Sequence, residues 1–319
     1  MGILEAICEE RRADVSRLKR KRPPSTLVRA ASGPRPAFPP RALPPASATM
    51  SFAGQAAARG RPFLIAECKR ASPSKGLMVA DYDPLSLAHA YEAGGASVVS
   101  VLTEPRRFLG ADEHLAAVRA AIGLPVLRKD FVIDIWQLRE AWALGADAVL
   151  LIAACLEVSQ LAEFAAAARE LGLSVLVETR EASELEGAIA ARPDAIGVNA
   201  RDLRDFSISS SVPLEMLREI ARLAPASLPR IAESGIKGGA EALFLRDAGY
   251  DGFLVGEALA TAADPRRATA DFVAAITGGD AAQAQGDAAQ AQGDAAGPNR
   301  GAEGSRRDQA TGGGRDKAP

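Results

Sequence analysis

The chain has 319 residues, of which 48% are hydrophobic and 24% are charged, so it holds enough apolar material for the core of a large globular domain. The composition excludes membrane spans and collagen-like repeats. Because 38 Lys and Arg residues nearly balance 40 Asp and Glu residues, net charge gives no reason to expect a nucleic acid or a membrane surface as partner, and a small-molecule ligand is the default expectation.

Cysteine and histidine are scarce in the chain, which contains only Cys8, Cys68, Cys155, His89 and His114. The cysteines lack the spacing of a metal site, and the histidines lie far from them in the sequence. The first 21 residues have neither the apolar core nor the cleavage site of a signal peptide. We therefore expect no zinc site, and a cytoplasmic protein with reduced thiols.

The first 60 residues predict a helix followed by a linker. Ile3, Leu4, Ile7 and Val15 suit one face of an amphipathic helix. Residues 23–45 contain too much proline for a helix or a central strand. Residues 1–60 are thus expected to form an N-terminal helical extension with a Pro-rich linker.

One unit then recurs between residues 63 and 276, a helical stretch that ends in glycine and is followed by a short apolar run. The five examples are Gly94 before SVVSVL, Gly123 before PVLRKD, Gly145 before AVLLIA, Gly172 before SVLVET and Gly249 before GFLVG. Glycine accommodates the left-handed cap of a helix, and a β-branched run suits a strand that is buried on both faces. Adding FLIAECK at 63–69, AIGVNA at 195–200 and RIAES at 230–234 gives eight strands.

Each of these runs is followed by a helical pattern, for example Asp134 as N-cap with Ile135, Leu138 and Trp142 on one face. Eight alternating βα units match the (β/α)8 barrel. A doubly wound sheet usually has fewer strands, and the glycine fingerprint of a dinucleotide-binding domain is absent after the first strand. We predict an α/β protein whose residues 61–276 form a (β/α)8 TIM barrel.

The residues after the predicted barrel, 277–319, consist mostly of Gly, Ala, Gln and Asp, and GDAAQAQ at 279–285 recurs at 286–292. Such a composition cannot bury a core, so we expect a disordered, low-complexity tail.

Polar side chains stand at the ends of six predicted strands, where a barrel of this kind has its active site. Alternation along the first strand places Glu67 and Lys69 on one side and Cys68 toward the helices. A single charge at a strand end is as well explained by solvation. Several charges in one mouth would be destabilising unless they neutralise one another and a ligand, so we predict one functional site. Its candidates are Glu67, Lys69, Lys129, Glu178, Asn199, Arg201, Glu233, Ser234 and Glu257.

Glycine and hydroxyl residues in the loops suggest a phosphate site. SPSKG at 72–76 follows the first strand, Gly235 follows the seventh and Gly256 the eighth. Loops after strands 7 and 8 are the usual phosphate site of such barrels. The alternative is that these glycines only make tight turns.

The stretch IAECKRASPSKG at 65–76 closely resembles the signature of the indole-3-glycerol-phosphate synthase family. So do LPVLRKDF at 124–131, LVE at 176–178, GVNARDL at 197–203, AESGI at 232–236 and LVGEAL at 254–259. The resemblance covers roughly residues 3–276, and its departures, Cys68, Ala111 and Ala200, remove no charge from the site. It implies ring closure of 1-(2-carboxyphenylamino)-1-deoxyribulose 5-phosphate to indole-3-glycerol phosphate, with release of CO2 and water, in tryptophan biosynthesis. It implies no cofactor and no metal.

The resemblance also implies roles for individual residues. Lys129 resembles the acid of the condensation, and Glu67 and Lys69 the base and acid of the dehydration, although the assignment of each lysine to its step stays open. Glu178 is expected to orient a lysine. Asn199, Arg201, Glu233 and Ser234 are expected to line the sugar and anthranilate part, and Ser72, Gly235, Gly256 and the backbone of Glu257 to hold the phosphate.

Three other functions stay open. A Schiff-base aldolase is compatible with lysines at strand ends, and borohydride trapping would reveal it. Phosphoribosylanthranilate isomerase would need a Cys and Asp pair, whereas Cys68 is expected to point outward. A binding scaffold would be favoured only if the charged positions were eroded. The expected partner is a phosphorylated small molecule, with no nucleic acid and no membrane, and the expected assembly is a monomer or a weak homo-oligomer.

Overall fold

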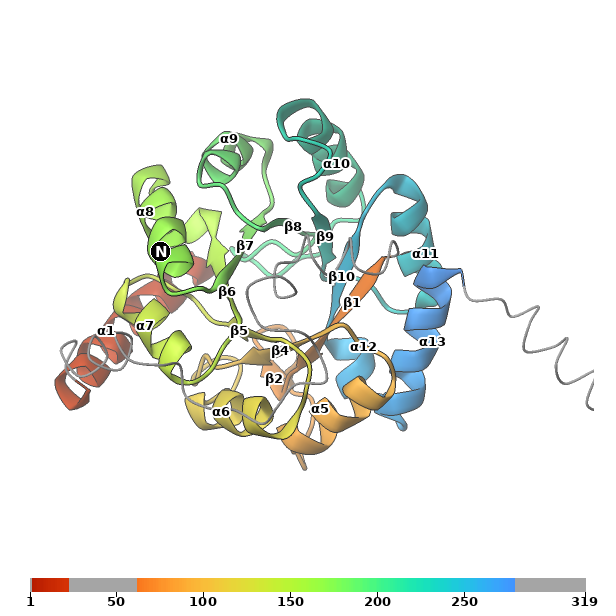
Figure 1. Ribbon diagram of the computed structural model, residues 1–319, viewed down its shortest axis with the longest axis horizontal. Helices are drawn as coiled ribbons and strands as arrows, with labels where there is room; N and C mark the ends of the chain where they lie inside the picture. The colour runs from red at the N-terminus through yellow and green to blue at the C-terminus, as the bar shows by residue number, and fades with distance from the viewer. Residues whose placement is uncertain (1, 23–61, 279–319) are drawn as a thin grey trace, which may run out of the picture. The chain divides into compact units, whose positions relative to one another are not determined.

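The computed structural model describes residues 2–22 and 62–278, which include one helix of the N-terminal region and a complete barrel (Figure 1). The predicted Pro-rich linker and nearly all of the predicted tail lie outside these residues, so the domain limits stay predictions. The last helix, α13 (Pro265–Thr277), ends one residue after the expected limit of the barrel.

Eight parallel strands close into a barrel, and the predicted (β/α)8 TIM barrel is confirmed. Their order around the barrel is β1 (Phe63–Cys68), β10 (Gly252–Val255), β9 (Arg230–Glu233), β8 (Ala195–Asn199), β7 (Ser174–Thr179), β6 (Ala148–Ile152), β5 (Val126–Lys129) and β4 (Val98–Leu102). The register pairs Asn199 with Glu233 and Leu102 with Lys129. Polar residues from distant parts of the sequence therefore meet at one end of the barrel.

An outer ring of helices covers the barrel (Figure 1). Besides α13 it comprises α5 (Pro84–Ala93), α6 (Asp112–Ala121), α7 (Trp136–Ala143), α8 (Val158–Glu170), α9 (Ala182–Ala190), α10 (Val212–Leu223) and α11 (Gly239–Ala248). Four short elements were not predicted: the antiparallel strands β2 (Ala71–Ser72) and β3 (Gly76–Leu77), the 3₁₀ turn η1 (Ala153–Cys155) and helix α12 (Glu257–Ala260).

Alternation along the strands divides the core into two layers. In β1, Leu64, Ala66 and Cys68 pack between the barrel and its helices, whereas Phe63 and Ile65 fill the barrel interior. The same alternation turns Glu67 inward, at the mouth of the barrel.

The predicted glycine caps are right at three positions and wrong at two. Gly145, Gly172 and Gly249 have the expected positive φ values of 90°, 72° and 118°. At Gly94 the backbone is right-handed, and its neighbour Gly95 carries the positive φ of 87°. Helix α6 ends at Ala121, and the next residue, Ile122, already has extended backbone, so Gly123 caps nothing. Gly94 is needed for space, because a Cβ there would lie 2.6 Å from Thr269 Cβ of α13.

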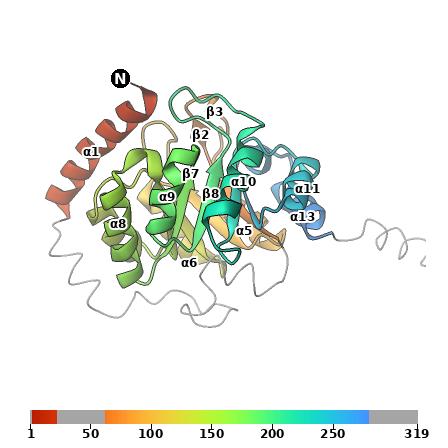
Figure 2. The same cartoon turned by 90° about the horizontal axis from the view of Figure 1, so that it is seen from above.

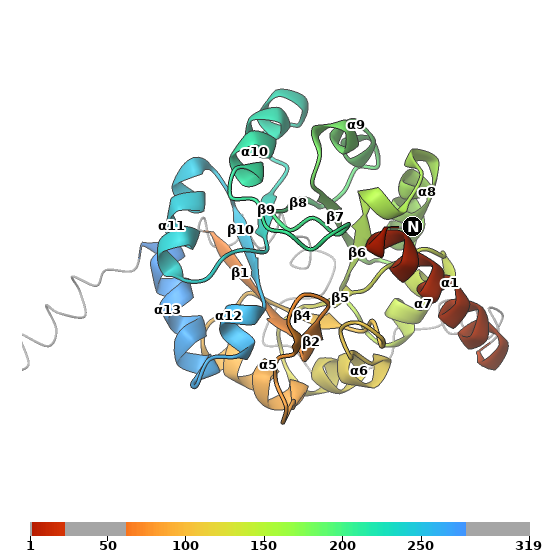
Figure 3. The same cartoon turned by 180° about the vertical axis from the view of Figure 1, so that it is seen from behind.

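The N-terminal helix α1 (Ile3–Lys21) lies at the end of the barrel that carries β2 and β3, beside β6 and α7 (Figures 2 and 3). Its residues Leu4, Ile7 and Cys8 join the apolar cluster of the barrel interior, and Val15 packs against Trp136. The helix is thus part of the rim around the barrel mouth.

Candidate active site

The carboxyl ends of the strands open into a cavity of about 530 Å³. All twelve residues predicted for the site line this cavity, which gathers Glu67, Lys69, Ser72, Lys129, Glu178, Asn199, Arg201, Glu233, Ser234, Gly235, Gly256 and Glu257. They come from six strands or from the loops that follow them, as expected when parallel strands end at one face.

Lys129 occupies the centre of the polar floor. Its Nζ lies 3.1 Å from Oε2 of Glu178 and 2.9 Å from Oε2 of Glu233. Both carboxylates are almost completely buried, whereas 16% of the lysine side chain is exposed toward the cavity. Asn199 Nδ2 donates a hydrogen bond of 2.8 Å to Glu178 Oε1, which fixes that carboxylate from the neighbouring strand.

The three charges of this group shift one another's pKa. Burial opposes the charge of Lys129, but Glu178 and Glu233 together raise the lysine pKa above its ordinary value. Burial also opposes ionisation of Glu178, yet Lys129 and Asn199 lower the pKa of this carboxyl group. For Glu233, burial raises the pKa to about 8 against the attraction of Lys129, and the Glu178 carboxylate adds to the rise. The floor therefore combines a charged ammonium group with two carboxyl groups whose pKa values are shifted in opposite directions.

A second ion pair stands at the end of β1. Lys69 Nζ lies 3.2 Å from Glu67 Oε1 and 5.8 Å from the centre of the Phe108 ring. Gly256 leaves room for this pair, because a Cβ there would lie 2.5 Å from the same Glu67 oxygen. Cys68 points to the helices, as predicted, with its Sγ 3.8 Å from the carbonyl oxygen of Pro84.

The loops after β1, β9 and β10 form the other side of the cavity. Ser72 is buried, and within the described residues its Oγ has no hydrogen-bond partner. Ser234 and Gly235 both have positive φ, of 65° and 76°. This conformation is uncommon for serine, and such strain is often found at binding sites. An unpartnered hydroxyl group and an irregular backbone suit a ligand rich in acceptor oxygens.

Arg201, on the loop after β8, ties this loop to the loop after β1. Its Nη1 donates hydrogen bonds to Ser74 Oγ at 3.1 Å and to the carbonyl oxygen of Phe206 at 3.0 Å. Its backbone N–H donates to Asn199 Oδ1 at 2.9 Å. Arg201 therefore stands above the cavity with its guanidinium group already oriented.

The apolar wall of the cavity and the cation Lys237 were not predicted from the sequence. The wall includes Leu102, Phe108, Phe131, Leu203, Phe206 and Ile208. Lys75, from the predicted phosphate loop, also lines the cavity. Apolar loop residues have the same sequence pattern as core residues. The position of Phe131, directly after the polar end of β5, was the one available signal.

Within residues 2–22 and 62–278, no group of three or more His, Cys, Asp or Glu side chains is arranged to hold a metal ion. No helix in this same part of the chain is both long and apolar enough to cross a membrane.

Comparison with known proteins relates the chain to one family. The model of the family described as indole-3-glycerol phosphate synthase matches residues 4–272. A protein of that name from Azoarcus sp. (strain BH72) is 42% identical over 266 residues, which are 82% of this chain and 96% of the relative. Another of the same name, from Mycobacteroides abscessus, is 49% identical over 214 residues, 67% of this chain and 77% of the relative.

Solved structures share the fold at low identity. The 3-hexulose-6-phosphate synthase from Salmonella typhimurium superposes with a TM-score of 0.54 at 15% identity, over 68% of this chain and 100% of that chain. The orotidine 5'-phosphate decarboxylase from Pyrococcus horikoshii gives 0.51 at 16% identity, over 67% and 99%. These likenesses extend to the barrel alone.

Proposed function

This chain belongs to the indole-3-glycerol phosphate synthase family, and from that membership we propose how its residues divide the work of the reaction. The chain is a carboxy-lyase of tryptophan biosynthesis. It closes the ring of 1-(2-carboxyphenylamino)-1-deoxyribulose 5-phosphate, with loss of CO2 and water, to give indole-3-glycerol phosphate. The distribution of roles among the residues of the cavity is our proposal.

Lys129 is the acid of the ring closure. As the aromatic carbon attacks the ribulose carbonyl, negative charge develops on the carbonyl oxygen and requires a proton. The observation that carries this assignment is the position of Lys129 Nζ, within 3.1 Å of both Glu178 and Glu233 and open to the cavity. The Glu178 carboxylate keeps the ammonium group charged and oriented until the oxygen takes its proton, and Glu233 accepts a hydrogen bond from the same ammonium group on the other side.

Glu67 and Lys69 carry out the later loss of water. After CO2 has left, a proton must be removed from carbon and a hydroxyl group must leave with a proton. The pair, 3.2 Å apart, provides a carboxylate base and an ammonium acid on one side of the cavity. Burial lowers the pKa of Lys129, and Glu178, Glu233 and, to a smaller extent, Glu67 raise it. Glu67, the partner of Lys69, is therefore close enough to act on Lys129, which supports a location of both lysines around one substrate.

The remaining residues bind the two ends of the substrate. Ser72, Gly235, Gly256 and the backbone of Glu257 hold the phosphate, and the unpartnered Oγ of Ser72 supports this assignment. Asn199, Arg201, Glu233 and Ser234 line the sugar and anthranilate part. The apolar wall with Phe108 and Phe131 suits the flat anthranilate ring.

We propose further that residues 61–276 are the catalytic domain, with residues 1–60 and 277–319 as its extension and tail. We also propose that the protein acts in the cytoplasm as a monomer or weak homo-oligomer, without nucleic acid or a membrane.

The experiment is a fluorescence assay of indole formation from the anthranilate–ribulose substrate, with purified wild-type protein, Lys129→Met and Lys129→Arg. The wild type forms the product. Loss of a general acid costs about 10²- to 10⁴-fold in rate, and we expect both variants to show it. Lys129→Arg keeps the positive charge between the two carboxylates but is a poor acid. An active Lys129→Arg variant would show that the position supplies only charge.

A further inference from the structure

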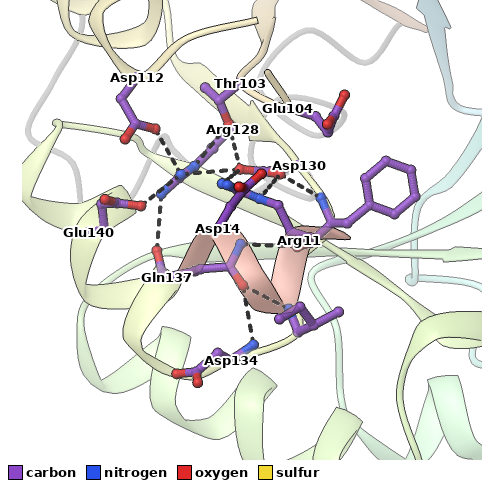
Figure 4. Close-up of polar contacts among 12 residues, drawn as sticks. Arg11, Asp14, Thr103, Glu104, Asp112, Arg128, Asp130, Asp134, Gln137 and Glu140 are labelled. Carbon is purple, nitrogen blue, oxygen red and sulfur yellow. Dashed lines mark hydrogen bonds and ion pairs between the residues drawn. The ribbon is translucent and has the colours of Figure 1, made fainter. Parts of the chain in front are cut away.

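A buried ionic cluster joins the N-terminal helix to Asp130, the residue after β5 (Figure 4), and Asp130 also borders the cavity. Arg11 of α1 and Asp130 meet in a bidentate pair, with Nε to Oδ1 at 2.9 Å and Nη2 to Oδ2 at 2.5 Å. Their side chains are 3% and 0% exposed. These two residues are 119 positions apart in the sequence, and neither has a place in the reaction as described so far.

Asp130 is fixed by more than this pair. Its Oδ1 also accepts a hydrogen bond of 2.8 Å from the N–H of Phe131. Its Oδ2 also accepts hydrogen bonds from the hydroxyl group of Thr103 at 2.8 Å and from Arg128 Nη2 at 3.1 Å. The N–H of Thr103 in turn donates to the carbonyl oxygen of Lys129 at 3.1 Å. The carboxylate thus holds the backbone after Asp130 directly, through the N–H of Phe131, and the backbone before Asp130 indirectly, through Thr103.

The charges of the cluster make Arg11 the principal counter-ion of Asp130. Arg128, the other cation, is shared, because its Nη2 also lies 2.9 Å from Asp112 and 2.9 Å from Glu140. Burial opposes ionisation of Asp130. The positive charge of Arg11 and, to a smaller extent, that of Arg128 nevertheless keep the pKa of this carboxyl group below its ordinary value. Without Arg11, three carboxylates would share the Arg128 guanidinium group.

We propose that Arg11 is a positioning residue for the reaction, which acts through Asp130 to fix the segment from Lys129 to Phe131. In this way the Lys129 ammonium group is held between Glu178 and Glu233, and the Phe131 ring is kept in the apolar wall. The proposal rests on the role of Lys129 given above. It also gives the N-terminal helix a part in catalysis.

The other ion pairs between α1 and the barrel provide a matched control. Lys19 Nζ lies 2.5 Å from Asp134 Oδ2, on the loop after β5, and both side chains are about one-third exposed, at 34% and 29%. Asp134 keeps its hydrogen bond to the N–H of Trp136 when the lysine is removed. Lys19→Met therefore removes an attachment of the same helix without disturbing Asp130.

The test measures the single-turnover rate at saturating substrate, together with KM and the thermal midpoint, on the full chain with Arg11→Met, Arg11→Lys and Lys19→Met. A displacement of about 1 Å in a catalytic group can cost about 10²-fold, so we expect Arg11→Met to lower the rate about 10- to 100-fold. KM should change less than the rate, because the phosphate-binding loops are untouched and Phe131 is only one part of the apolar wall. Lys19→Met should stay within about twofold of the wild type, the range of a surface pair.

Arg11→Lys distinguishes positioning from simple attachment of the helix. A lysine restores the charge but makes only one strong hydrogen bond, so its rate should lie between those of the wild type and Arg11→Met. Asp130→Asn combined with Arg11→Met should be no slower than the slower single variant, because both changes remove one interaction. The proposal is overturned if Arg11→Met, assayed well below its thermal midpoint, turns over at the wild-type rate, or if Lys19→Met is equally slow.

This outcome is separable from that of the Lys129 assignment. Activity of Lys129→Arg would remove the assigned role of the lysine whatever the Arg11 variants do. With the lysine role intact, a wild-type rate for Arg11→Met would remove only the positioning role.

Discussion

Ionisation of Glu233 should leave a measurable dependence of stability on pH. The carboxyl group is 1% exposed, its Oε2 binds Lys129 at 2.9 Å, and its Oε1 has no hydrogen-bond partner among the described residues. Glu233→Gln keeps the shape of the side chain but cannot ionise. We expect the free energy of unfolding of the wild type, relative to this variant, to fall as pH rises.

The sign and size follow from the pKa of this group. Burial raises the pKa of Glu233 from an ordinary 4.5 to about 8, so between these values the folded protein binds a proton that the unfolded chain has released. The stabilisation from this proton is complete below pH 4.5 and is lost as pH rises to 8, at up to about 1.4 kcal/mol per pH unit. Glu178 and Lys129 do not contribute in this window, because the glutamate pKa is lowered and the lysine pKa is raised.

The assay is urea unfolding at pH 5, 6, 7 and 8 of the wild type, Glu233→Gln and a control, Glu257→Gln. Glu257 lines the same cavity, but its side chain is 47% exposed. The free energy of unfolding of the wild type minus that of Glu233→Gln should fall steadily from pH 5 to pH 8. The free energy of unfolding of the wild type minus that of Glu257→Gln should stay constant. Parallel curves for wild type and Glu233→Gln would refute the reasoning, because they would show that Glu233 does not bind its proton more tightly in the folded state.

Three further predictions concern binding and packing. Inorganic phosphate should compete with substrate. Ser72→Ala should raise both KM and the phosphate inhibition constant without lowering kcat, because the phosphate group is bound equally in the ground state and the transition state. A lower kcat at unchanged KM would contradict this prediction. Gly94→Ala should reduce the free energy of unfolding by about 1–3 kcal/mol, because the alanine Cβ would lie 2.6 Å from Thr269 Cβ. Equal stability of the variant and the wild type in urea unfolding would show that α5 and α13 move apart at no cost in free energy. Removing residues 279–319, which contain almost no large apolar side chains, should leave the thermal midpoint and turnover unchanged, and a large fall in the midpoint would mean that the domain extends further.

Local patterns were sufficient to predict the strands and the twelve candidate residues that line the cavity. The two-residue period of a strand placed Glu67 and Lys69 inward and Cys68 outward, and the ends of parallel strands had to meet. For this reason residues as distant in sequence as Lys129 and Glu233 could be assigned to one site before their contact was known.

Features that depend on packing between distant elements could not be predicted in this way. The pairing of Arg11 with Asp130 requires the position of α1 on the barrel, which no local pattern contains. The same holds for Gly94, whose need for space comes from Thr269 on another helix. The apolar wall is a third case, because Phe108 and Phe131 face a cavity that only the finished barrel creates.

The division of labour between the two lysines is tested most directly by rapid-quench measurement of CO2 and of the indole product, each separately, in single turnovers of Lys129→Met and Lys69→Met. If Lys129 is the acid of ring closure, its variant releases neither CO2 nor product. If Lys69 acts only in the loss of water, its variant releases CO2 promptly and forms the indole slowly. Prompt CO2 release by Lys129→Met, or none by Lys69→Met, would contradict the assignment and show that the roles are reversed or shared.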